Sequence, residues 1–587
     1  MQDIDRFKRI KVKLNMANIN SWKDIDWKSI DKQTFRLQLR IFKAADKQEW
    51  EKMYKLQKLL IASSSAKYLA VRRVTQDNTG KRTPGVDQLT ITTPSQKFAL
   101  ANQLTLDGKS SPIRRVYLPY PDGKRRPLGI PTIEDRAKQA LAYLAFCPQW
   151  EAKFEAGSYG FRPGRSVADA MEAVFLGISK KPKWVLDADI SKCFDEINHQ
   201  YLLDKCHTFP ELQRQIRSWL KAGILDVKTE LFPEMGTPQG GILSPLLANI
   251  ALHGLRDQLD AHINSLGGHR PNNRQALTYV RYADDFVLMY PDLEVLEQLR
   301  EVVIQFLAPI GLELHPMKTR IVHTYEATTD STPPGFTFLG FDVIQRQKRN
   351  RQRKVKAFRN VNSQQDFITL ITPSKEGVKK HKVKVREVIR RYKGASQERL
   401  IQVLNPIIRG WANSKRSQIS SRVFQALDSY LWEHLWKWAR KRHPKMSKVQ
   451  LKQKYWHTVK KNNWVFGVKK KETVVLRLQS YSKISIQRYA KVKGKASPFD
   501  GDLLYWAKRT GKSVFLPTYK ARLIKEQKGR CGICGDFFLP EDVIERDHII
   551  PKALGGKNRR DNVHAVHRYC HLKKTKADMV IWHRTRK

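Results

Sequence analysis

The run "VRYADDFVLMY", residues 280–290, places two adjacent carboxylates inside a stretch of strand-forming residues. Apolar and aromatic residues flank Asp284 and Asp285 on both sides. Because β-branched Val280 and Val287 favour extended backbone, the run predicts a β-hairpin whose tight turn carries the two acids. Two carboxylates about 4 Å apart repel by roughly 4 kcal/mol at an effective dielectric constant near 20, so the pair needs a compensating cation. Oxygen ligands suit Mg²⁺, which proteins hold with one or two carboxylates and substrate phosphates. The hairpin therefore indicates phosphoryl-transfer chemistry, with a solvated acidic turn as the plainer alternative.

The charge balance indicates a polyanionic partner. Among 587 residues, 109 Lys and Arg stand against 56 Asp and Glu, a formal net charge of +53. The 41% of hydrophobic residues can fill several cores, which excludes a disordered polyelectrolyte. We find no apolar run of about 18 residues and no signal-peptide pattern in "MQDIDRFKRI", so nucleic acid is favoured over a membrane surface and an intracellular location is expected.

Periodicity and turn residues predict the order of the elements. Residues 1–105 are expected to be mostly helical and end in the loop "NTGKRTPGVD". A basic hairpin with an Asp-Gly turn follows and leads into a helix that begins near Thr132. Residues 184–190 predict a buried strand, and a Gly-rich loop leads into an apolar helix at "GTPQGGILSPLLANIALHGL".

From about residue 350 the chain becomes helical and very basic. Val385, Ile389 and Tyr392 follow one helical stripe, with Lys and Arg on the other face. Pro406 predicts a break between two helices. The tryptophans of residues 423–438 fall at helical spacing and are expected in a core rather than as platforms for nucleic-acid bases. Residues 445–515 stay basic, contain interleaved Trp and Tyr, and carry no assignable motif.

A series of motifs connects the acidic hairpin with a known family. A two-metal site needs carboxylates that converge from separate strands, and Asp189, at the end of an expected strand, meets this need together with Asp284 and Asp285. The motifs that surround these residues are, in order, "RPLGIPTIEDR", "GSYGFRPGRS", "DADISKCFDEINH", "GTPQGGILSPLLANI", "YADD", "HPMKT" and "FTFLGF". Over about residues 70–345, this series resembles the palm of reverse transcriptases and, more closely, bacterial group II intron-encoded proteins.

The resemblance implies roles for individual residues. It implies that Asp189, Asp284 and Asp285 are Mg²⁺ ligands. It implies that Phe194 is an aromatic gate that excludes a ribose 2′-hydroxyl, and an ordinary core position remains the alternative for this residue. The residues that it implies in nucleotide binding are Arg114, Arg126, Gln239 and Lys318, and the planar fork of arginine suits phosphate.

One position departs from the family pattern. Tyr120 stands where many relatives have a Lys before the hairpin turn, which puts a phosphate contact there in doubt. Lys124 either substitutes for that Lys or faces solvent, and both interpretations stay open.

The basic helical region resembles the thumb and maturase segment of the same family, on the residues "LNPIIRGWANSKRS". There the resemblance implies binding of the parent intron RNA to promote its splicing. The residues alone indicate only a nucleic-acid clamp, because Lys and Arg on helices give salt-sensitive affinity without sequence preference.

The last sixty residues or so contain three of the six cysteines, which indicates metal binding rather than disulfides. Cys531 and Cys534 form one Cys-x-x-Cys knuckle, and His567 and Cys570 form a His-x-x-Cys knuckle, a set that matches a tetrahedral structural zinc site. His564, three residues before His567, is an alternative donor that is less well placed.

Between and beside these knuckles lie four further residues of interest: Asp547, His548, Asn562 and His571. Over about residues 520–580 the pattern resembles an HNH endonuclease, the ββα-metal module. The resemblance implies that His548 is the general base, that Asp547 and His571 hold one divalent metal, and that Asn562 orients the loop. In the usual pattern a cysteine stands at the position of His567. A zinc ribbon without nuclease activity is the alternative.

The sequence therefore predicts an α+β chain: a right-hand polymerase with fingers, palm and thumb, a helical maturase/thumb region, a basic DNA-binding segment and a C-terminal ββα-metal (HNH) zinc domain. The expected ranges are 1–105 for the N-terminal extension and start of the fingers, 106–345 for the fingers and palm, 346–444 for the thumb/maturase region, 445–515 for the basic DNA-binding region and 516–587 for the HNH domain.

The expected function is that of a multifunctional group II intron-encoded protein that acts as reverse transcriptase, splicing cofactor and DNA endonuclease in intron homing. Its expected partners are group II intron RNA, target DNA, primer-template and dNTPs, with Mg²⁺, structural Zn²⁺ and one nuclease metal, in the bacterial cytoplasm near the nucleoid. The alternative is an RNA-binding maturase with weak or lost catalysis. A reverse transcriptase of cellular defence would leave the maturase-like segment and the HNH tail unexplained.

Overall fold

The computed structural model describes residues 21–119, 125–222, 224–225, 230–231, 240–328, 333–348, 366–459, 462–470, 473–514 and 516–585. Tyr120, Lys124 and Gln239 lie outside the described residues, and so does the side chain of Arg126. Among the described residues, no helix combines the length and the apolar character that a membrane crossing requires.

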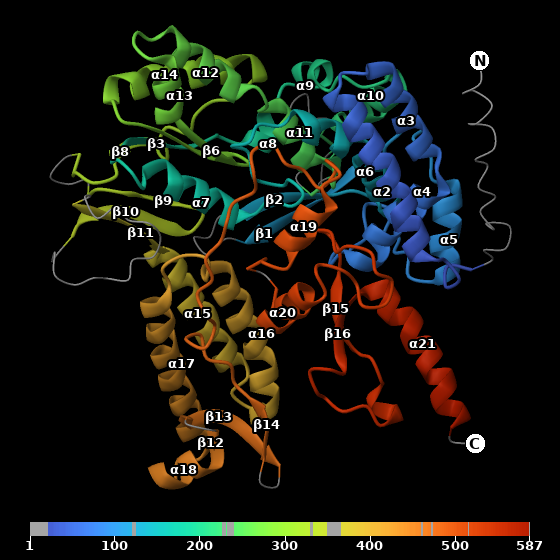
Figure 1. The fold of residues 1–587 in the computed structure, drawn as a ribbon, viewed down its shortest axis with the longest axis vertical. Helices are drawn as coiled ribbons and strands as arrows, with labels where there is room; N and C mark the ends of the chain where they lie inside the picture. The colour runs from blue at the N-terminus through green and yellow to red at the C-terminus, as the bar shows by residue number, and fades with distance from the viewer. Residues whose placement is uncertain are drawn as a thin grey trace.

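The N-terminal part is helical, as its periodicity predicts (Figure 1). Its helices are α2 (Trp27–Asp46), α3 (Trp50–Ala62), α4 (Ser64–Arg72), the π-helical turn η1 (Arg73–Asp77) and α5 (Pro94–Gln103). They pack around α6 (Ile133–Lys153), which begins at the N-cap Thr132, whose hydroxyl accepts a hydrogen bond from the Asp135 amide. Because α6 is buried on nearly all sides, it forms the central support of the fingers.

The expected basic hairpin precedes α6. Its strands β1 (Ile113–Pro119) and β2 (Arg125–Ile130) are antiparallel, and β1 also pairs with β4 (Ile224–Leu225), which pairs with β5 (Glu230–Leu231). The sheet order is β2-β1-β4-β5.

The palm contains a four-stranded antiparallel sheet in the order β6-β7-β3-β8. Its strands are β3 (Trp184–Asp189), β6 (Thr278–Tyr282), β7 (Asp285–Tyr290) and β8 (Arg320–His323). The helices of this region are α7 (Val167–Ile178), α8 (Cys193–Glu196), α9 (His199–Lys205), α10 (Pro210–Leu220), α11 (Ser244–Ala251), α12 (Leu255–Ser265), α13 (Arg270–Ala276), α14 (Leu293–Leu307) and the short η2 (Ala308–Ile310).

Alternation along the palm strands divides their side chains between two cores. Leu186 and Leu288 pack with residues of α12 and α14, whereas Val185 and Val287 pack with residues of α7. Because successive side chains of a strand point to opposite faces, an almost continuous apolar run fills both sides of the sheet. Because apolar side chains cover both faces of the sheet, the polar residues are left at the strand ends, along the edge of the sheet.

A second sheet of order β11-β10-β9 joins the palm to the thumb. Its strands are β9 (Phe336–Phe338), β10 (Phe341–Gln347) and β11 (Phe367–Pro373), and the thumb helices are α15 (Lys375–Arg391), α16 (Gln397–Lys415) and α17 (Ser421–Arg442). The expected break at Pro406 is wrong, because α16 continues through it. Leu404 and Ile408 are fully buried on either side, and their packing outweighs the one backbone hydrogen bond that proline lacks.

The thumb core extends beyond α17. It also contains residues of α18 (Lys448–Tyr455), β12 (Trp456–Val459), β13 (Asn462–Lys470) and β14 (Thr473–Arg477). Trp438 is buried in this core, as expected, but the expectation fails for Trp432, which is 40% exposed. Trp432 stacks on Trp436, one turn further along the helix, with ring centroids 5.6 Å apart.

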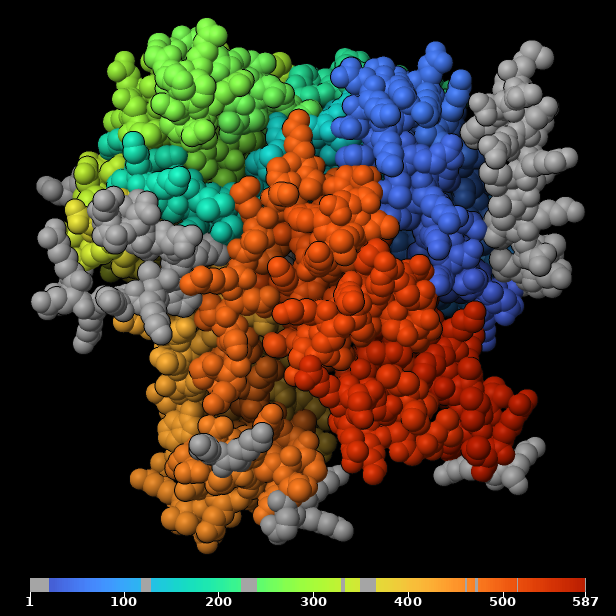
Figure 2. All heavy atoms as spheres, viewed as in Figure 1, coloured from blue at the N-terminus to red at the C-terminus, as the bar shows by residue number. Residues whose placement is uncertain are grey.

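The segment after β14 crosses the face of the molecule from the thumb toward the fingers and includes α19 (Leu503–Thr510) (Figures 1 and 2). The C-terminal part then forms α20 (Thr518–Glu526), antiparallel β15 (Ile544–His548) and β16 (Val563–His567), the short η3 (Lys552–Leu554) and α21 (Arg568–Arg584). This ββα arrangement and the palm, fingers and thumb confirm the expected α+β fold class.

Candidate active sites

The acidic turn of the palm lies between β6 and β7, as the sequence predicts. Asp189, the last residue of β3, is the register partner of Asp285, the first residue of β7, and Asp284 lies in the turn before it. Ala283 adopts a positive φ of 61° to make this turn. The fold therefore brings the two segments that carry the three aspartates side by side.

A neighbouring loop approaches the turn closely. A Cβ atom at Gly160 would lie 2.3 Å from the amide nitrogen of Ala283, so only glycine permits this approach. The loop is fixed by backbone hydrogen bonds in both directions: the Tyr159 amide donates to the Arg281 carbonyl, and the Arg281 amide donates to the Gly157 carbonyl, each at 2.9 Å. The motif "GSYGFRPGRS" thus supports the acidic turn.

Arg281 is fully buried beneath the turn. Its Nη1 donates to the carbonyl of Ala283 at 3.2 Å and to Oδ1 of Asn249 at 3.0 Å, and its Nε donates to the Tyr279 hydroxyl at 3.0 Å. Glu155, with its Oε2 3.7 Å from Nη2 of Arg281, supplies the opposite charge. Since Arg281 holds the carbonyl next to Asp284, it positions the carboxylates without facing them.

The electrostatics of the turn favour a cation. Burial of the Asp285 carboxyl, together with the negative charges of Asp284 and Asp189, raises the pKa of Asp285 to about 7. Lys318 hydrogen-bonds to Oδ2 of Asp189, and this contact raises the pKa of Lys318. Nearby, burial raises the pKa of Asp187 to about 6, although Nε of Arg320 donates to it at 3.2 Å. Two carboxyl groups whose charged forms are disfavoured, those of Asp285 and Asp187, make this edge of the sheet a suitable site for a divalent metal.

Phe194 lies in α8, directly beyond the end of β3. It is half-buried, it packs against the palm core, and its ring meets Phe161 edge to face with centroids 6.5 Å apart. Phe161, which is 52% exposed and has a positive φ of 57°, belongs to the loop that supports the turn. The two rings form an aromatic wall close to Asp189.

Of the expected nucleotide-binding residues, Arg114 and Lys318 can be described with their side chains. Arg114 lies in β1, and its Nε is buried without a hydrogen-bond partner among the described residues, which suits a phosphate ligand. Arg126 lies in β2 as the register partner of Leu118. A Cβ atom at Gly240, where φ is +124°, would lie 2.2 Å from the carbonyl oxygen of Gly129, so the end of the "TPQGG" loop rests directly on β2.

The two knuckles of the C-terminal part converge. The ligand atoms of Cys531, Cys534, His567 and Cys570 all lie within 4.8 Å of one another. Nδ1 of His567 faces Sγ of Cys534 at 3.5 Å, and Oδ2 of Asp542 lies 3.2 Å from Nε2 of His567. A carboxylate behind a histidine fixes the ring for metal binding, and three cysteines with one histidine are a common zinc set, so these residues fit zinc.

On the other side of β15, Asp547 lies among basic side chains. Its Oδ1 is 3.5 Å from Nε2 of His571, and its Oδ2 is 3.3 Å from Nε2 of His564 and from Nζ of Lys574. Oε2 of Glu545 holds Nδ1 of His571 at 2.6 Å. Burial opposes ionisation of Glu545, but hydrogen bonds from His571 and Arg568 prevail and lower its pKa. His571 therefore turns a fixed Nε2 toward Asp547, which suits a second metal site.

His548 and Asn562 lie on either side of the loop that joins β15 to β16. His548 ends β15, and Asn562 ties the loop between the strands: its Oδ1 accepts from the Ile550 amide at 2.8 Å, and its Nδ2 donates to the carbonyls of Ile550 and Lys557, each at 3.0 Å. His564 faces Asp547, and the structure groups His567, not His564, with the cysteines.

Among the supporting residues that sequence reasoning missed are Arg281, Asp542, Glu545 and Lys574. Of these four, Glu545 had a usable signal, because residues two apart on a strand share a face and Glu545 stands two before Asp547. The other three act through contacts with residues distant in sequence or on another element.

Four family models match the chain in the order of these structural parts. Residues 22–104 match the N-terminal domain of reverse transcriptase, and residues 118–343 match reverse transcriptase (RNA-dependent DNA polymerase). Residues 378–456 match the maturase-specific domain of group II introns, and residues 531–577 match HNH endonuclease.

Known proteins with similar sequences include protein YkfC of Escherichia coli (strain K12), 33% identical over 339 residues, which are 51% of this chain and 86% of that protein. The uncharacterized 91 kDa protein in cob intron of Schizosaccharomyces pombe is 29% identical over 52% of this chain and 43% of its own length. The group II intron-encoded protein LtrA of Lactococcus lactis subsp. cremoris is 28% identical over 48% of this chain and 55% of its own length. The chain thus spans about half of the last two relatives.

The matched domains define a reverse transcriptase that also carries a maturase-specific domain and an HNH endonuclease domain. The chain belongs to the family of group II intron-encoded proteins. The expected combination of a polymerase, a maturase and an endonuclease in one chain is thereby confirmed at the level of its domains.

Proposed function

We propose that this protein reverse-transcribes RNA at the palm, with Asp189, Asp284 and Asp285 as the Mg²⁺ ligands. The observation that carries the proposal is the pairing of Asp189 with Asp285 across β3 and β7, next to the turn that holds Asp284. Bound Mg²⁺ would activate the primer hydroxyl and neutralise charge on the triphosphate. The raised pKa of Asp285 supports this assignment, because a group of repelling carboxylates gains most from a divalent cation.

The residues around the turn would orient the substrates. Arg114 and Arg126, on the two strands of the fingers hairpin, would hold the triphosphate, with Lys124 and Gln239 as further contacts. Lys318 would balance the charge of Asp189 until substrate binds, and Phe194 would limit the space at the sugar. The buried, unpartnered Nε of Arg114 supports its role as a phosphate ligand.

In the C-terminal domain, we propose that His548 is the general base of a DNA endonuclease and that Asp547 and His571 hold its divalent metal. Zinc at Cys531, Cys534, His567 and Cys570 would have a structural role, and Asn562 would keep the intervening loop in place. The contact of Glu545 with His571 supports the metal site, since such carboxylates orient metal-binding histidines. Cleavage of one target strand would supply the primer for reverse transcription.

The maturase-specific domain and the basic character of the thumb support group II intron RNA as a partner, and residues 445–515 are proposed to contact target DNA. A chromosomal DNA target would place this activity at the nucleoid, in the cytoplasm of a bacterial cell. We also propose that the five regions of the chain have the ranges expected from the sequence.

The test is Asp284→Asn, with exposed Asp257→Asn in α12 as the matched control. The Asp284 variant should lose Mg²⁺-dependent cDNA synthesis on a primed RNA template by at least about 100-fold, because one metal-binding charge is removed, and should retain affinity for intron RNA. Synthesis is measured by extension of a labelled primer, and RNA affinity by filter binding. Full synthesis by the variant would refute the palm assignment. An inactive wild type that still promotes splicing would favour the alternative, a maturase with lost catalysis.

A further inference from the structure

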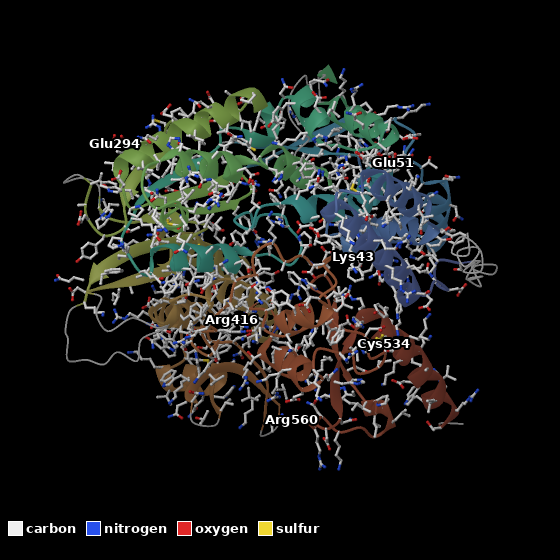
Figure 3. All side chains as sticks on the ribbon, turned by 45° about the horizontal axis from the view of Figure 1, so that its top comes forward. Lys43, Glu51, Glu294, Arg416, Cys534 and Arg560 are labelled. Carbon is white, nitrogen blue, oxygen red and sulfur yellow. The ribbon has the colours of Figure 1, made fainter. Side chains whose placement is uncertain are left out.

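Beside His548, the proposed general base, lies a hollow of about 190 Å³ with a strongly basic lining. It is formed by α20, β15 and the loop that leads into β16, and its lining residues are Tyr519, Arg522, Leu523, Arg546, Asn558, Arg559, Arg560 and Val563. Figure 3 labels Arg560 at the outer edge of the C-terminal domain. The lining thus contains four guanidinium groups and no carboxylate.

The charge of the hollow is only partly neutralised from outside. Arg560 forms an ion pair with Glu526, and Nε of Arg522 is 3.9 Å from the same carboxylate. Nη2 of Arg546 donates to Oδ1 of Asn558 rather than to an acid. One carboxylate therefore serves two of the four guanidinium groups, and an excess of positive charge remains around a cavity large enough for a small anion. Arginine forks match phosphate oxygens in geometry as well as in charge.

The hollow lies on the side of β15 that carries His548. Alternation along the strand places Arg546 and His548 on one face, and Glu545 and Asp547 on the other. Asn558 connects the hollow with the histidine, since its Oδ1 lies 3.4 Å from Nε2 of His548 and also accepts from Arg546. An anion in the hollow would therefore lie next to the proposed general base.

We propose that the hollow binds a phosphodiester of the DNA strand on which His548 acts, at a linkage near the scissile one, and so sets the register of the cut. This inference rests on the proposed endonuclease function. DNA is the favoured polyanion because the hollow shares Asn558 with His548, whereas the surfaces assigned to RNA belong to the thumb. Because the contact is to the backbone, it positions the strand without reading its sequence.

The first experiment measures single-turnover cleavage of target DNA by the full chain. Arg559→Gln is the test variant and Arg584→Gln, an exposed arginine near the end of α21, is the matched control. Uncharged methylphosphonate linkages are introduced one at a time along the cleaved strand. We expect Arg559→Gln to slow cleavage about tenfold. One methylphosphonate near the cut should slow the wild type and the control by a similar factor. The same methylphosphonate should have no further effect on the Arg559 variant.

Two results would overturn the proposal at this stage. One is an unchanged cleavage rate for Arg559→Gln. The other is that every methylphosphonate slows the Arg559 variant by the same factor as it slows the wild type. Equal factors would mean that no linkage shares its contact with Arg559.

The second experiment does not depend on cleavage. The full-length His548→Ala variant, which keeps the four proposed zinc ligands, is treated with an arginine-specific dicarbonyl reagent, and modification is read by mass spectrometry. Target duplex DNA should protect Arg522, Arg559 and Arg560 at least about fivefold more than Arg584. Absence of protection, or protection only by an RNA of the same sequence, would overturn the proposal. If DNA protects these residues but the wild type does not cleave, the endonuclease function fails while the phosphate site remains.

Discussion

At the scale of single residues, Phe194 decides which nucleotides the palm can accept if its ring faces the sugar. Its edge-to-face contact with Phe161 fixes the ring in one orientation beside Asp189. Phe194→Ala would open space for a 2′-hydroxyl, and we expect incorporation of ribonucleotides relative to deoxynucleotides to rise about tenfold, equivalent to ~1.4 kcal/mol of lost discrimination. The ratio is measured by single-nucleotide extension with each substrate.

The matched control is Phe194→Tyr, which keeps the ring and should keep the discrimination. An unchanged ratio in the Ala variant, with a normal thermal transition, would identify Phe194 as a residue of the palm core only.

Arg281 acts beneath the same turn by positioning rather than by contact with substrate. Arg281→Lys retains the charge but loses the planar fork that reaches Tyr279, Asn249 and Ala283. Because buried partners are left unsatisfied, the free energy of unfolding should fall by about 2 kcal/mol. We also expect cDNA synthesis to fall more than the folded fraction does, because Ala283 directly precedes Asp284.

Exposed Arg274→Lys in α13 is the control and should change neither quantity. Denaturant unfolding and primer extension measure both effects. A variant with lower stability but full activity per folded molecule would show that Arg281 does not position the turn.

The residues of the palm motifs could be identified from their order in the chain. The buried residues that hold the acidic turn in place could not. "YADD" predicts a hairpin because strand-forming residues flank it, and the structure confirms the hairpin. The burial of Arg281 could not be inferred in the same way, since an arginine in a strand is usually exposed. Its neutralising partner, Glu155, lies 126 positions earlier and meets it only in the folded chain.

At the scale of elements, the thumb helices are connected by a buried histidine. His381 of α15 is 5% exposed, stacks on Trp411 of α16 with centroids 4.5 Å apart, and its Nε2 lies 2.7 Å from the hydroxyl of Tyr481. Burial, together with the nearby charge of Lys384, lowers the pKa of His381 from 6.5 to about 4. The ring is therefore neutral in the folded thumb at neutral pH.

This shift predicts a loss of thumb stability in mild acid. Between pH 6.5 and 4 the unfolded chain binds a proton at His381 that the folded chain does not, so the contribution to stability that is present above pH 6.5 declines as the pH falls toward 4. Hydrogen exchange of α15 amides, corrected for intrinsic rates, should be faster at pH 5 than at pH 7. His381→Gln should reduce this difference, and an equal pH dependence in both proteins would contradict the assignment to His381.

Element positions were predictable where the apolar period is clear, and failed where packing overrides local preference. The stripe through Val385 and Ile389 predicts α15, and both residues are buried there. Pro406 misleads because the helix-breaking preference of proline is local and does not account for the packing of the buried residues around it. Trp432 misleads in the opposite way, since it stands one position after Leu431 of the buried stripe and its side chain lies at the surface.

At the scale of the whole molecule, contacts with the palm and with the fingers are among those that attach the C-terminal part to the polymerase. Asp169 of α7 is fully buried and is reached by Arg509, by the Tyr489 hydroxyl at 3.0 Å and by the Val492 amide at 2.7 Å. These contacts anchor the segment before the HNH domain to the palm. The domain itself meets the fingers through Lys28 of α2, whose Nζ lies 3.2 Å from Oδ2 of Asp536.

The second attachment depends on the knuckle that carries Asp536, two residues after Cys534. Zinc binding in small modules supplies roughly 10–16 kcal/mol of folding free energy, whereas an exposed ion pair contributes at most about 1 kcal/mol. Loss of metal should therefore unfold the knuckle and release its contact with α2, while the anchor at Asp169, which contains none of the proposed zinc ligands, should persist. The contacts of Asp169 therefore limit the unfolding to the part of the chain that follows them.

We expect His567→Ala to lose zinc and to become sensitive to protease from about residue 520 onward, while residues up to α19 remain protected on the palm. Polymerase activity should persist, because Asp285 of the acidic turn pairs with Asp189 of β3, and Lys318, which contacts Asp189, also belongs to the palm. His564→Ala is the matched control: it removes a histidine three positions away that faces Asp547 and should keep its zinc. Zinc content, the masses of the proteolytic fragments and primer extension are measured for both variants. Full zinc occupancy in the His567 variant would remove that residue from the site, and a first cut between residues 489 and 510 would show that the contacts of Asp169 do not hold the segment once the domain unfolds.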